Sequence, residues 1–197
     1  MPFPTQAAPP PARLVADTLL LRPIAATDAE IDHDALMETR DFLRVWEQTG
    51  WPADDFSVED NRADLATLEQ RHADGVAYTY TVLDPTGTRC LGCVYVMPRD
   101  ARFLALSTIT PLAEHRWDDV EAAVYLWVRA SEQERRTDRA LLEHLRTWFA
   151  MAWDLRRVVH VTHEDLAQQV ALLADAGLAP LFAIEEPGKQ GRYLAYG

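Results

Sequence analysis

The chain has 197 residues and a formal net charge of −12 at neutral pH, and 48% of its residues are hydrophobic. These values are typical of a globular protein of one domain, and they argue against nucleic acid as a main partner because nucleic-acid binding needs a basic surface. An acidic chain weakly favours cationic or amine partners through long-range steering. No apolar run predicts a membrane span and no secretion signal is visible, so we expect a cytoplasmic protein without a membrane partner.

The two cysteines, Cys90 and Cys93, have the Cys-x-x-Cys spacing of zinc and redox sites. A second cysteine pair is missing, and the surrounding residues are typical of a strand interior. On a strand, residues three apart point to opposite faces. We therefore interpret both cysteines as small core residues in a reducing compartment and expect no metal site.

The N-terminal residues 1–13 are rich in Pro and Ala, which predicts an extended arm rather than a packed element. We expect this arm to lie against the body or a neighbouring subunit, so a homodimer is possible. Residues 14–197 are expected to form a single domain that begins with a strand within 14–24. A capping-box pattern at Thr27–Glu30 then predicts the start of one helix, and a second helix is expected to begin at Ser57-Val-Glu-Asp60.

Two alternating apolar segments, 76–83 and 91–97, flank the turn Asp84-Pro-Thr-Gly87 and predict an antiparallel hairpin. Residues 102–110 fit either a short strand or a helix, and 111–119 a polar loop. The segment 122–128 then reads as a buried strand.

A polar loop follows that strand and leads into a helix with Leu141, Leu145 and Trp148 on one face. Downstream we expect strands at 157–161, 181–185 and 192–196, and a helix that begins at a capping-box variant, Asp165–Gln168. This order predicts an α/β (α+β) fold with a mixed, mostly antiparallel central sheet of six to seven strands and helices on both faces.

Three patterns together resemble the GNAT superfamily of acyl-CoA N-acyltransferases over roughly residues 15–197. They are the opening segment Thr18–Asp28, the hairpin Tyr78–Val96, and Tyr125-Leu-Trp-Val-Arg129 with its following loop and helix. The resemblance implies acetyl-CoA as co-substrate. It also implies an N-acetyltransferase acting on a small amine or a peptide amine.

In that family, a loop of the pattern Arg/Gln-x-x-Gly-x-Gly/Ala holds the coenzyme A pyrophosphate at a helix N-terminus. Here the pattern reads Gln133-Glu-Arg-Arg136-Thr-Asp138, with Arg136 and Asp138 in place of the two glycines. Neighbouring arginines suit phosphate binding. The coenzyme A contacts implied by the resemblance are Val128, Gln133, Arg135, Arg136, Asp138 and Arg139.

The same loop supports an alternative, because Asp138 near a helix N-cap would satisfy the free N–H groups and repel a pyrophosphate. Leu173 also stands where the family often has a Tyr that protonates the leaving thiolate. The alternative is a catalytically inactive GNAT-fold binding or dimerisation module that does not bind coenzyme A.

A general base is expected just before the central strand, where family members often carry a carboxylate. Glu121 is the first candidate and Asp118 the second, with His115 as a further possibility. Trp51 and Trp117 lie in segments that border the acceptor site in the family layout. The resemblance therefore implies that these two tryptophans contact the substrate.

Overall fold

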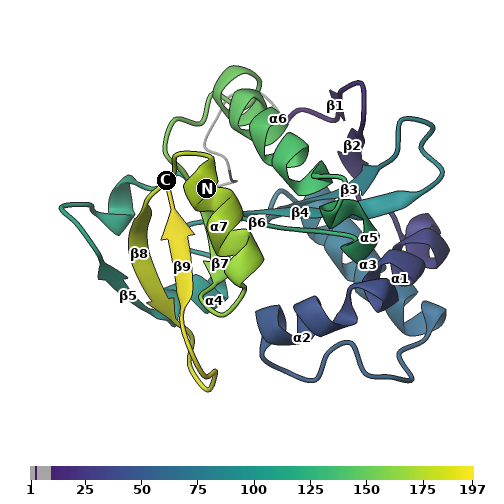
Figure 1. The fold of residues 1–197 in the computed structure, drawn as a ribbon, viewed down its shortest axis with the longest axis horizontal. Coiled ribbons are helices and arrows are strands. Elements are labelled where there is room, and N and C mark those ends of the chain that lie inside the picture. The colour runs from purple at the N-terminus through teal and green to yellow at the C-terminus, as the bar shows by residue number, and fades with distance from the viewer. Residues whose placement is uncertain (1–2, 4–9) are drawn as a thin grey trace.

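Within the part of the chain described by the computed structural model (residue 3 and residues 10–197), nine strands form one sheet in the order β1-β2-β3-β4-β6-β7-β9-β8-β5 (Figure 1). The strands are β1 (Leu14–Val15), β2 (Leu20–Pro23), β3 (Tyr78–Leu83), β4 (Cys90–Pro98), β5 (Thr108–Pro111), β6 (Ala122–Val128), β7 (Val158–His163), β8 (Pro180–Glu185) and β9 (Tyr193–Tyr196).

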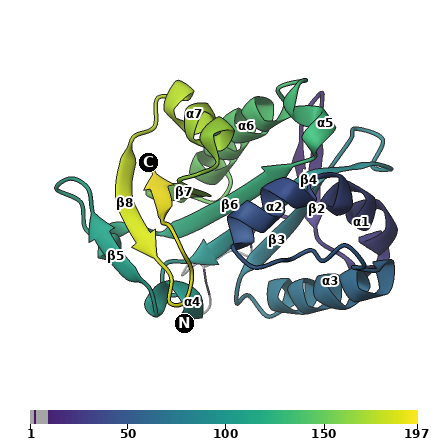
Figure 2. The ribbon, with the colours of Figure 1, turned by 60° about the horizontal axis from the view of Figure 1, so that its bottom comes forward.

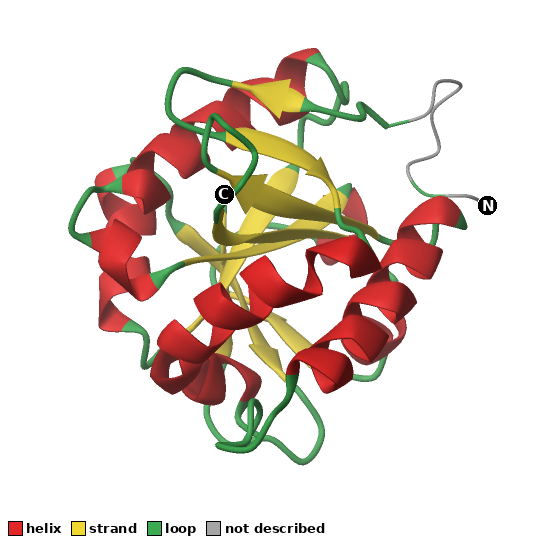
Figure 3. Ribbon diagram, turned by 90° about the vertical axis from the view of Figure 1, so that its right-hand side faces the viewer, coloured by secondary structure: helices red, strands yellow, loops and turns green. Residues whose placement is uncertain are grey.

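Helices cover both faces of this sheet (Figures 2 and 3). Figure 2 shows α5, α6 and α7 on one side and α1, α2 and α3 on the other. The helices are α1 (Ala29–Glu38), α2 (Arg40–Glu47), α3 (Val58–Ala73), α4 (Arg102–Ala105), α5 (Ala130–Gln133), α6 (Thr137–Met151) and α7 (Ala167–Asp175), with short 3-10 turns η1 (Ala26–Asp28) and η2 (Trp117–Asp119). Among these helices, none is long and apolar enough to cross a membrane.

Strands β6 and β7 form the one parallel pair among the described strands, and they stay paired only from Ala122–Val158 to Val124–His160. Beyond that point β6 continues to Val128 beside β4 and β7 continues to His163 beside β9, but the two strands no longer pair with each other. We call these diverging segments, residues 125–128 and 161–163, the β6–β7 fork. A fork of this kind leaves backbone groups of two central strands free of the sheet ladder.

Side chains of β6 alternate between two hydrophobic cores. Tyr125 and Trp127 belong to the core that contains residues of α1, α2 and α3. Leu126 and Val128 belong to the core that contains residues of α6. All seven residues of β6 are buried, so the strand contributes side chains to the hydrophobic cores on both faces of the sheet.

The mixed sheet with helices on both faces is confirmed, but the predicted six to seven strands become nine. The first expected strand is two strands, β1 and β2, joined by a turn closed by the bond from Ala16 N–H to the Leu19 carbonyl at 2.9 Å. Residues 102–110 hold both a helical turn, α4, and most of a strand, β5.

The helix expected after Ser57 is confirmed, and its start is closed by a capping box. Ser57 and Asp60 make both reciprocal bonds at the start of α3. The two predicted capping boxes, at Thr27 and Asp165, were wrong, because η1 precedes α1 and because α7 starts at Ala167 with Leu166, not Asp165, at its N-cap position.

The cysteines are free and buried, as expected, but they do not face opposite sides of the sheet. Both belong to the same hydrophobic core, because the pairing of β3 with β4 shifts by one residue between Val82–Gly92 and Leu83–Cys90. An extra residue of this kind reverses the alternation of side chains along a strand.

Residues 1–2 and 4–9 of the expected N-terminal arm lie outside the described residues. Where the arm is described, it lies against the body of the same chain. The Tyr78 hydroxyl donates to the Phe3 carbonyl, and the Tyr80 hydroxyl to the Pro11 carbonyl at 3.0 Å.

Candidate functional site

A cavity of about 500 Å³ lies between the α1–α3 layer and the sheet. Its walls come from α2, α3, β4, α4, β6 and β9, and from the connection before β9. We call it the aromatic cavity, because six of its lining side chains are aromatic: Trp46, Trp51, Tyr95, Phe103, Tyr125 and Tyr193. Its volume is in the usual range for a small-molecule site.

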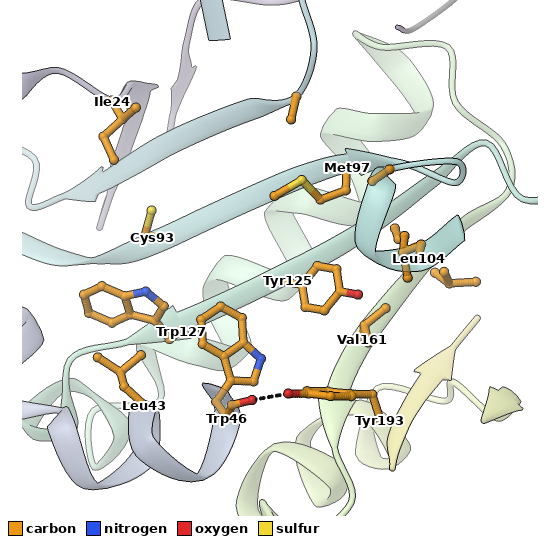
Figure 4. Packing of buried hydrophobic residues seen from close by; sticks show 14 of the residues in the cluster. Ile24, Leu43, Trp46, Cys93, Met97, Leu104, Tyr125, Trp127, Val161 and Tyr193 are labelled. Atoms are coloured by element: carbon orange, nitrogen blue, oxygen red, sulfur yellow. Dashed lines mark hydrogen bonds between the residues drawn. The ribbon is translucent and has the colours of Figure 1, made fainter. Parts of the chain in front are cut away.

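Contacts between the rings hold the wall of this cavity in place (Figure 4). The Tyr193 hydroxyl donates to the Trp46 carbonyl, a contact drawn as a dashed line. The Trp46 ring centroid lies 5.7 Å from that of Tyr95 and 6.1 Å from that of Tyr125. Such tilted pairs restrict each ring to one orientation.

Two polar atoms in this wall have no hydrogen-bond partner among the described residues, the Nε1 of Trp46 and the hydroxyl of Tyr125. The two residues are only 7% and 6% exposed. A buried donor or hydroxyl without a partner costs free energy in the empty site. Both atoms lie buried behind the cavity surface, each with less than 1 Å² of accessible area.

Charged side chains line the cavity in two groups. In one group, Lys189 Nζ lies 2.9 Å from a Glu186 carboxylate oxygen and 3.8 Å from a Glu47 carboxylate oxygen. Desolvation raises the pKa of Glu47, and the charge of Lys189 acts against this rise. Asp64 and Arg71 of α3 also line the cavity.

A groove runs along α7. One part lies between α6 and α7, and the other is bordered by residues 38–42 of the α1–α2 region. It consists of adjoining hollows, the two largest of about 330 and 260 Å³, which share Gln133 and Gln168 as lining residues. Leu126 and Val128 of the β6–β7 fork form part of its floor.

Five of the six expected coenzyme A contacts line this groove. They are Val128, Gln133, Arg136, Asp138 and Arg139. Arg135 is not among the lining residues: its side chain is 74% exposed and lies 3.5 Å from Glu132.

The loop before α6 has the backbone shape that the glycine pattern implies. Arg136 has φ 59° and ψ 31°, the left-handed conformation that favours glycine. Asp138 lies in the first turn of α6, where its carboxylate accepts the N–H of Arg139 at 2.8 Å. The expected self-satisfaction of the helix start by Asp138 is therefore present, although the N-cap residue is Arg136.

The amides that directly follow β6 are bonded within the protein. Ala130 N–H donates to the Thr39 hydroxyl at 3.1 Å, and Ser131 N–H to the Glu38 carboxylate at 2.8 Å. Arg129 is 7% exposed and forms ion pairs with Asp34 and Glu38. Further along the loop, the amides of Arg135 and Arg136 are also bonded, to the carbonyls of Glu132 and Gln133 at 3.2 and 3.0 Å.

The β6–β7 fork is bridged by one side chain, Gln169 of α7. Its amide nitrogen donates to the Leu126 carbonyl at 2.7 Å, and its amide oxygen accepts from the Thr162 hydroxyl at 2.6 Å. Leu126 and Thr162 each lie two residues past the last paired residues, Val124 and His160. Gln169 thus occupies the place of the ladder bonds that the fork lacks.

The other sequence candidates lie away from both hollows. Glu121 accepts the backbone N–H groups of Arg156 and Arg157 at 2.7 and 2.8 Å, which ties the start of β6 to the segment before β7. Asp118 is 76% exposed at its side chain and lies 3.6 Å from Arg116. Trp117 packs its ring against Phe182, as does His115.

Of the two expected substrate contacts, Trp51 lines the aromatic cavity, whereas Trp117 is not among its lining residues. Sequence reasoning missed Glu47, Tyr125 and Lys189 as site residues, and also Gln169. Glu47, Lys189 and Gln169 lie in segments without a recognisable motif, and Tyr125 lies in a pattern that indicated the fold and not a substrate contact. The available signal was the apolar spacing of Phe42, Leu43 and Trp46, which is typical of the inward face of a helix.

No known family sequence model matches the chain, and no curated protein matches it either. Solved structures do. A ribosomal L7/L12 alpha-N-protein acetyltransferase, RimL, in complex with coenzyme A is 19% identical, covers 93% of this chain and 94% of its own, and has a TM-score of 0.68.

Two further structures are similar over nearly the whole chain. The microcin C7 self-immunity acetyltransferase MccE, in complex with acetyl-CoA and AMP, is 15% identical, with 97% and 98% of the two chains covered and a TM-score of 0.66. A putative GnaT-family acetyltransferase from Bordetella pertussis is 16% identical, with 93% and 97% covered and a TM-score of 0.60. The chain therefore has the GNAT fold, as the sequence predicted.

Proposed function

We propose that this GNAT-fold chain is an acetyl-CoA-dependent N-acetyltransferase acting on a primary amine. The observation that carries the proposal is the relation of the two hollows to β6. Tyr125 lines the aromatic cavity on one face of the sheet, and the next residue, Leu126, lines the groove on the other. Two substrates held in these hollows would meet across one strand at the fork.

In this proposal the groove holds acetyl-CoA and the aromatic cavity holds the amine. The amine nitrogen attacks the thioester carbonyl, a C–N bond forms, and the C–S bond breaks. The nitrogen loses its proton to a carboxylate, and the thiolate leaves and takes a proton from water. Holding both reactants at the fork lowers the entropic part of the barrier.

Glu47 is the carboxylate that we propose as general base. It lines the cavity, and its raised pKa makes it a better proton acceptor than an ordinary surface carboxylate. Glu121 and Asp118, the bases expected from the sequence, are less favourable candidates for the general base. Glu121 accepts two backbone N–H groups, and the Asp118 side chain is exposed at the surface beside Arg116.

Titration calorimetry with acetyl-CoA and with coenzyme A tests the proposal. We expect submillimolar dissociation constants that Arg136→Glu weakens at least tenfold, because this change places a carboxylate at the pyrophosphate loop. Release of free thiol should then depend on an added amine. Absence of binding at millimolar ligand would contradict the proposal.

A second candidate function is a binding module without catalysis. It is favoured by Asp138, whose carboxylate occupies a first-turn N–H group, and by Gln169, which fills the fork. It predicts that neither coenzyme A nor acetyl-CoA binds at any accessible concentration. The same calorimetry therefore separates the two functions.

A further inference from the structure

The lining of the aromatic cavity is more selective in shape, charge and hydrogen bonding than a site for any primary amine needs to be. Its six aromatic rings, with Leu68 and Met97, suit a flat apolar body. A serine or alanine at a peptide N-terminus is too small to fill about 500 Å³ of such a cavity. The lining therefore favours a small molecule with a ring over a peptide end.

The charged side chains that line the cavity have one uncompensated negative charge, which one bound cation would neutralise. Three carboxylates, Glu47, Asp64 and Glu186, face two cations, Arg71 and Lys189, so the lining has one net negative charge. At the Lys189 end alone, two carboxylates share a single ammonium group, and the Glu47 contact is the longer one at 3.8 Å. A protonated amine beside Glu47 would complete this cluster.

The two unpartnered polar atoms call for a hydroxyl group. Trp46 Nε1 is a donor only, so its partner must accept, and the Tyr125 hydroxyl either donates or accepts. A ligand hydroxyl group placed between the two rings would accept from Trp46 Nε1 and pair with the Tyr125 hydroxyl. The two residues lie side by side in the wall, with ring centroids 6.1 Å apart (Figure 4).

From these three features we infer that the aromatic cavity binds a phenolic alkylamine, with its ammonium group at Glu47 and its hydroxyl group at Trp46 and Tyr125. The inference deepens the proposed function, because this amine would be the acetyl acceptor. The cavity itself is built without any part of the coenzyme groove, so the amine should bind in the absence of acetyl-CoA.

Three probe ligands separate the parts of the inference. Tyramine carries both groups, tyrosol replaces the amine by a neutral hydroxyl, and phenethylamine lacks the phenolic hydroxyl. By calorimetry without acetyl-CoA, tyramine should bind about tenfold more tightly than tyrosol, the scale of one charge-assisted hydrogen bond. It should bind roughly fivefold more tightly than phenethylamine, the scale of one neutral hydrogen bond.

Three variants assign these differences to residues. Glu47→Gln should weaken tyramine about tenfold and leave tyrosol within about twofold. Lys189→Met should tighten tyramine, because it removes the competing cation, whereas a purely structural role of Lys189 would weaken all three ligands. Trp46→Phe should weaken tyramine and tyrosol but not phenethylamine, because only the first two offer a phenolic hydroxyl.

Asp55→Asn is the matched control, since it removes one negative charge at an exposed position outside the cavity lining. It should leave all three affinities unchanged. Circular dichroism should be used to check that each variant is folded. If Trp46→Phe does not fold, Glu47→Gln and Lys189→Met still test the binding of the ammonium group.

The outcomes separate this inference from the proposed function. Equal binding of tyramine and tyrosol, or tighter binding of a tripeptide that begins with serine, overturns the inference. If acetyl-CoA binds and none of the three probes does, the inference is wrong and the transferase proposal stands. If tyramine binds as described and acetyl-CoA does not, the amine site stands and the transferase proposal is wrong.

Discussion

Arg136 holds a left-handed backbone conformation that costs a non-glycine residue about 1 kcal/mol. Arg136→Gly should therefore raise the free energy of unfolding by about 1 kcal/mol, measured by urea denaturation. Arg135→Gly is the control, because Arg135 is absent from the residues with positive φ. It should lower stability by a similar amount, and a loss of stability in both variants would contradict the interpretation.

His160 predicts a specific dependence of stability on pH. Burial, with a smaller contribution from the charge of Arg146, lowers the pKa of its imidazole to about 4. Between pH 6.5 and pH 4 the unfolded chain binds a proton that the folded chain does not. Stability is therefore lost as the pH falls through this range, by about 2 kcal/mol between pH 7 and pH 5.

The comparison of the wild type with His160→Leu isolates this effect. Asp32 works in the opposite direction, because burial raises its pKa to about 6 and favours the folded state as the pH falls. Both proteins contain Asp32, so its contribution cancels. The unfolding free energy of the wild type should fall relative to the variant on acidification. Parallel pH profiles would show that the imidazole titrates normally.

At the scale of elements, Gln169 is a side-chain bridge across the point where β6 and β7 diverge. An amide-bearing ligand that pairs with the β6 backbone must displace the Gln169 amide from the Leu126 carbonyl. Gln169→Ala should therefore increase the affinity for coenzyme A several-fold. It should also lower the unfolding free energy by about 1–3 kcal/mol, because Leu126 and Thr162 lose their partner.

Gln168→Ala is the matched control for this change. Gln168 lines the same groove but is exposed, and its removal leaves the fork bridged. It should not increase coenzyme A affinity. If Gln169→Ala lowers stability and leaves coenzyme A affinity unchanged, Gln169 only stabilises the fold at the fork and does not compete with the ligand.

Elements with strong local signals were predictable from the sequence. The hairpin of β3 and β4 has alternating side chains and a turn with Pro and Gly, and β6 is a continuous apolar run. Weak local signals failed in two ways. The short edge strand β5 has little hydrophobic pattern. At the two helix starts with predicted capping boxes, Thr27 lies in a 3-10 turn and Asp165 lies before the N-cap residue Leu166.

The candidate site was only half predictable, for a reason of the same kind. One part of the groove, from Gln133 to Arg139, is continuous along the chain, so its resemblance to the family's loop located it, whereas the groove residues on α7 were not predicted. The aromatic cavity joins segments as distant as Trp46 and Tyr193, which only the folded sheet brings together. Glu121 was misleading because a carboxylate before the central strand serves equally well as an acceptor for backbone N–H groups.

At the scale of the whole molecule, the net charge of −12 acts oppositely on the two proposed substrates. Coenzyme A is polyanionic, and the groove has more carboxylates than arginines among its lining residues. A protonated amine is attracted by the same field. Raising the ionic strength shortens the screening length from roughly 30 Å at 0.01 M to roughly 10 Å at 0.1 M, so both effects weaken.

Steady-state kinetics over this range of salt should therefore show two opposite trends. The KM for acetyl-CoA should fall as repulsion is screened, and the KM for the amine should rise as attraction is screened. Asp138→Asn should reduce the salt dependence for acetyl-CoA, because it removes a carboxylate from the groove, and should leave that for the amine unchanged. A rise of both KM values with salt would mean that local arginine contacts outweigh the overall field.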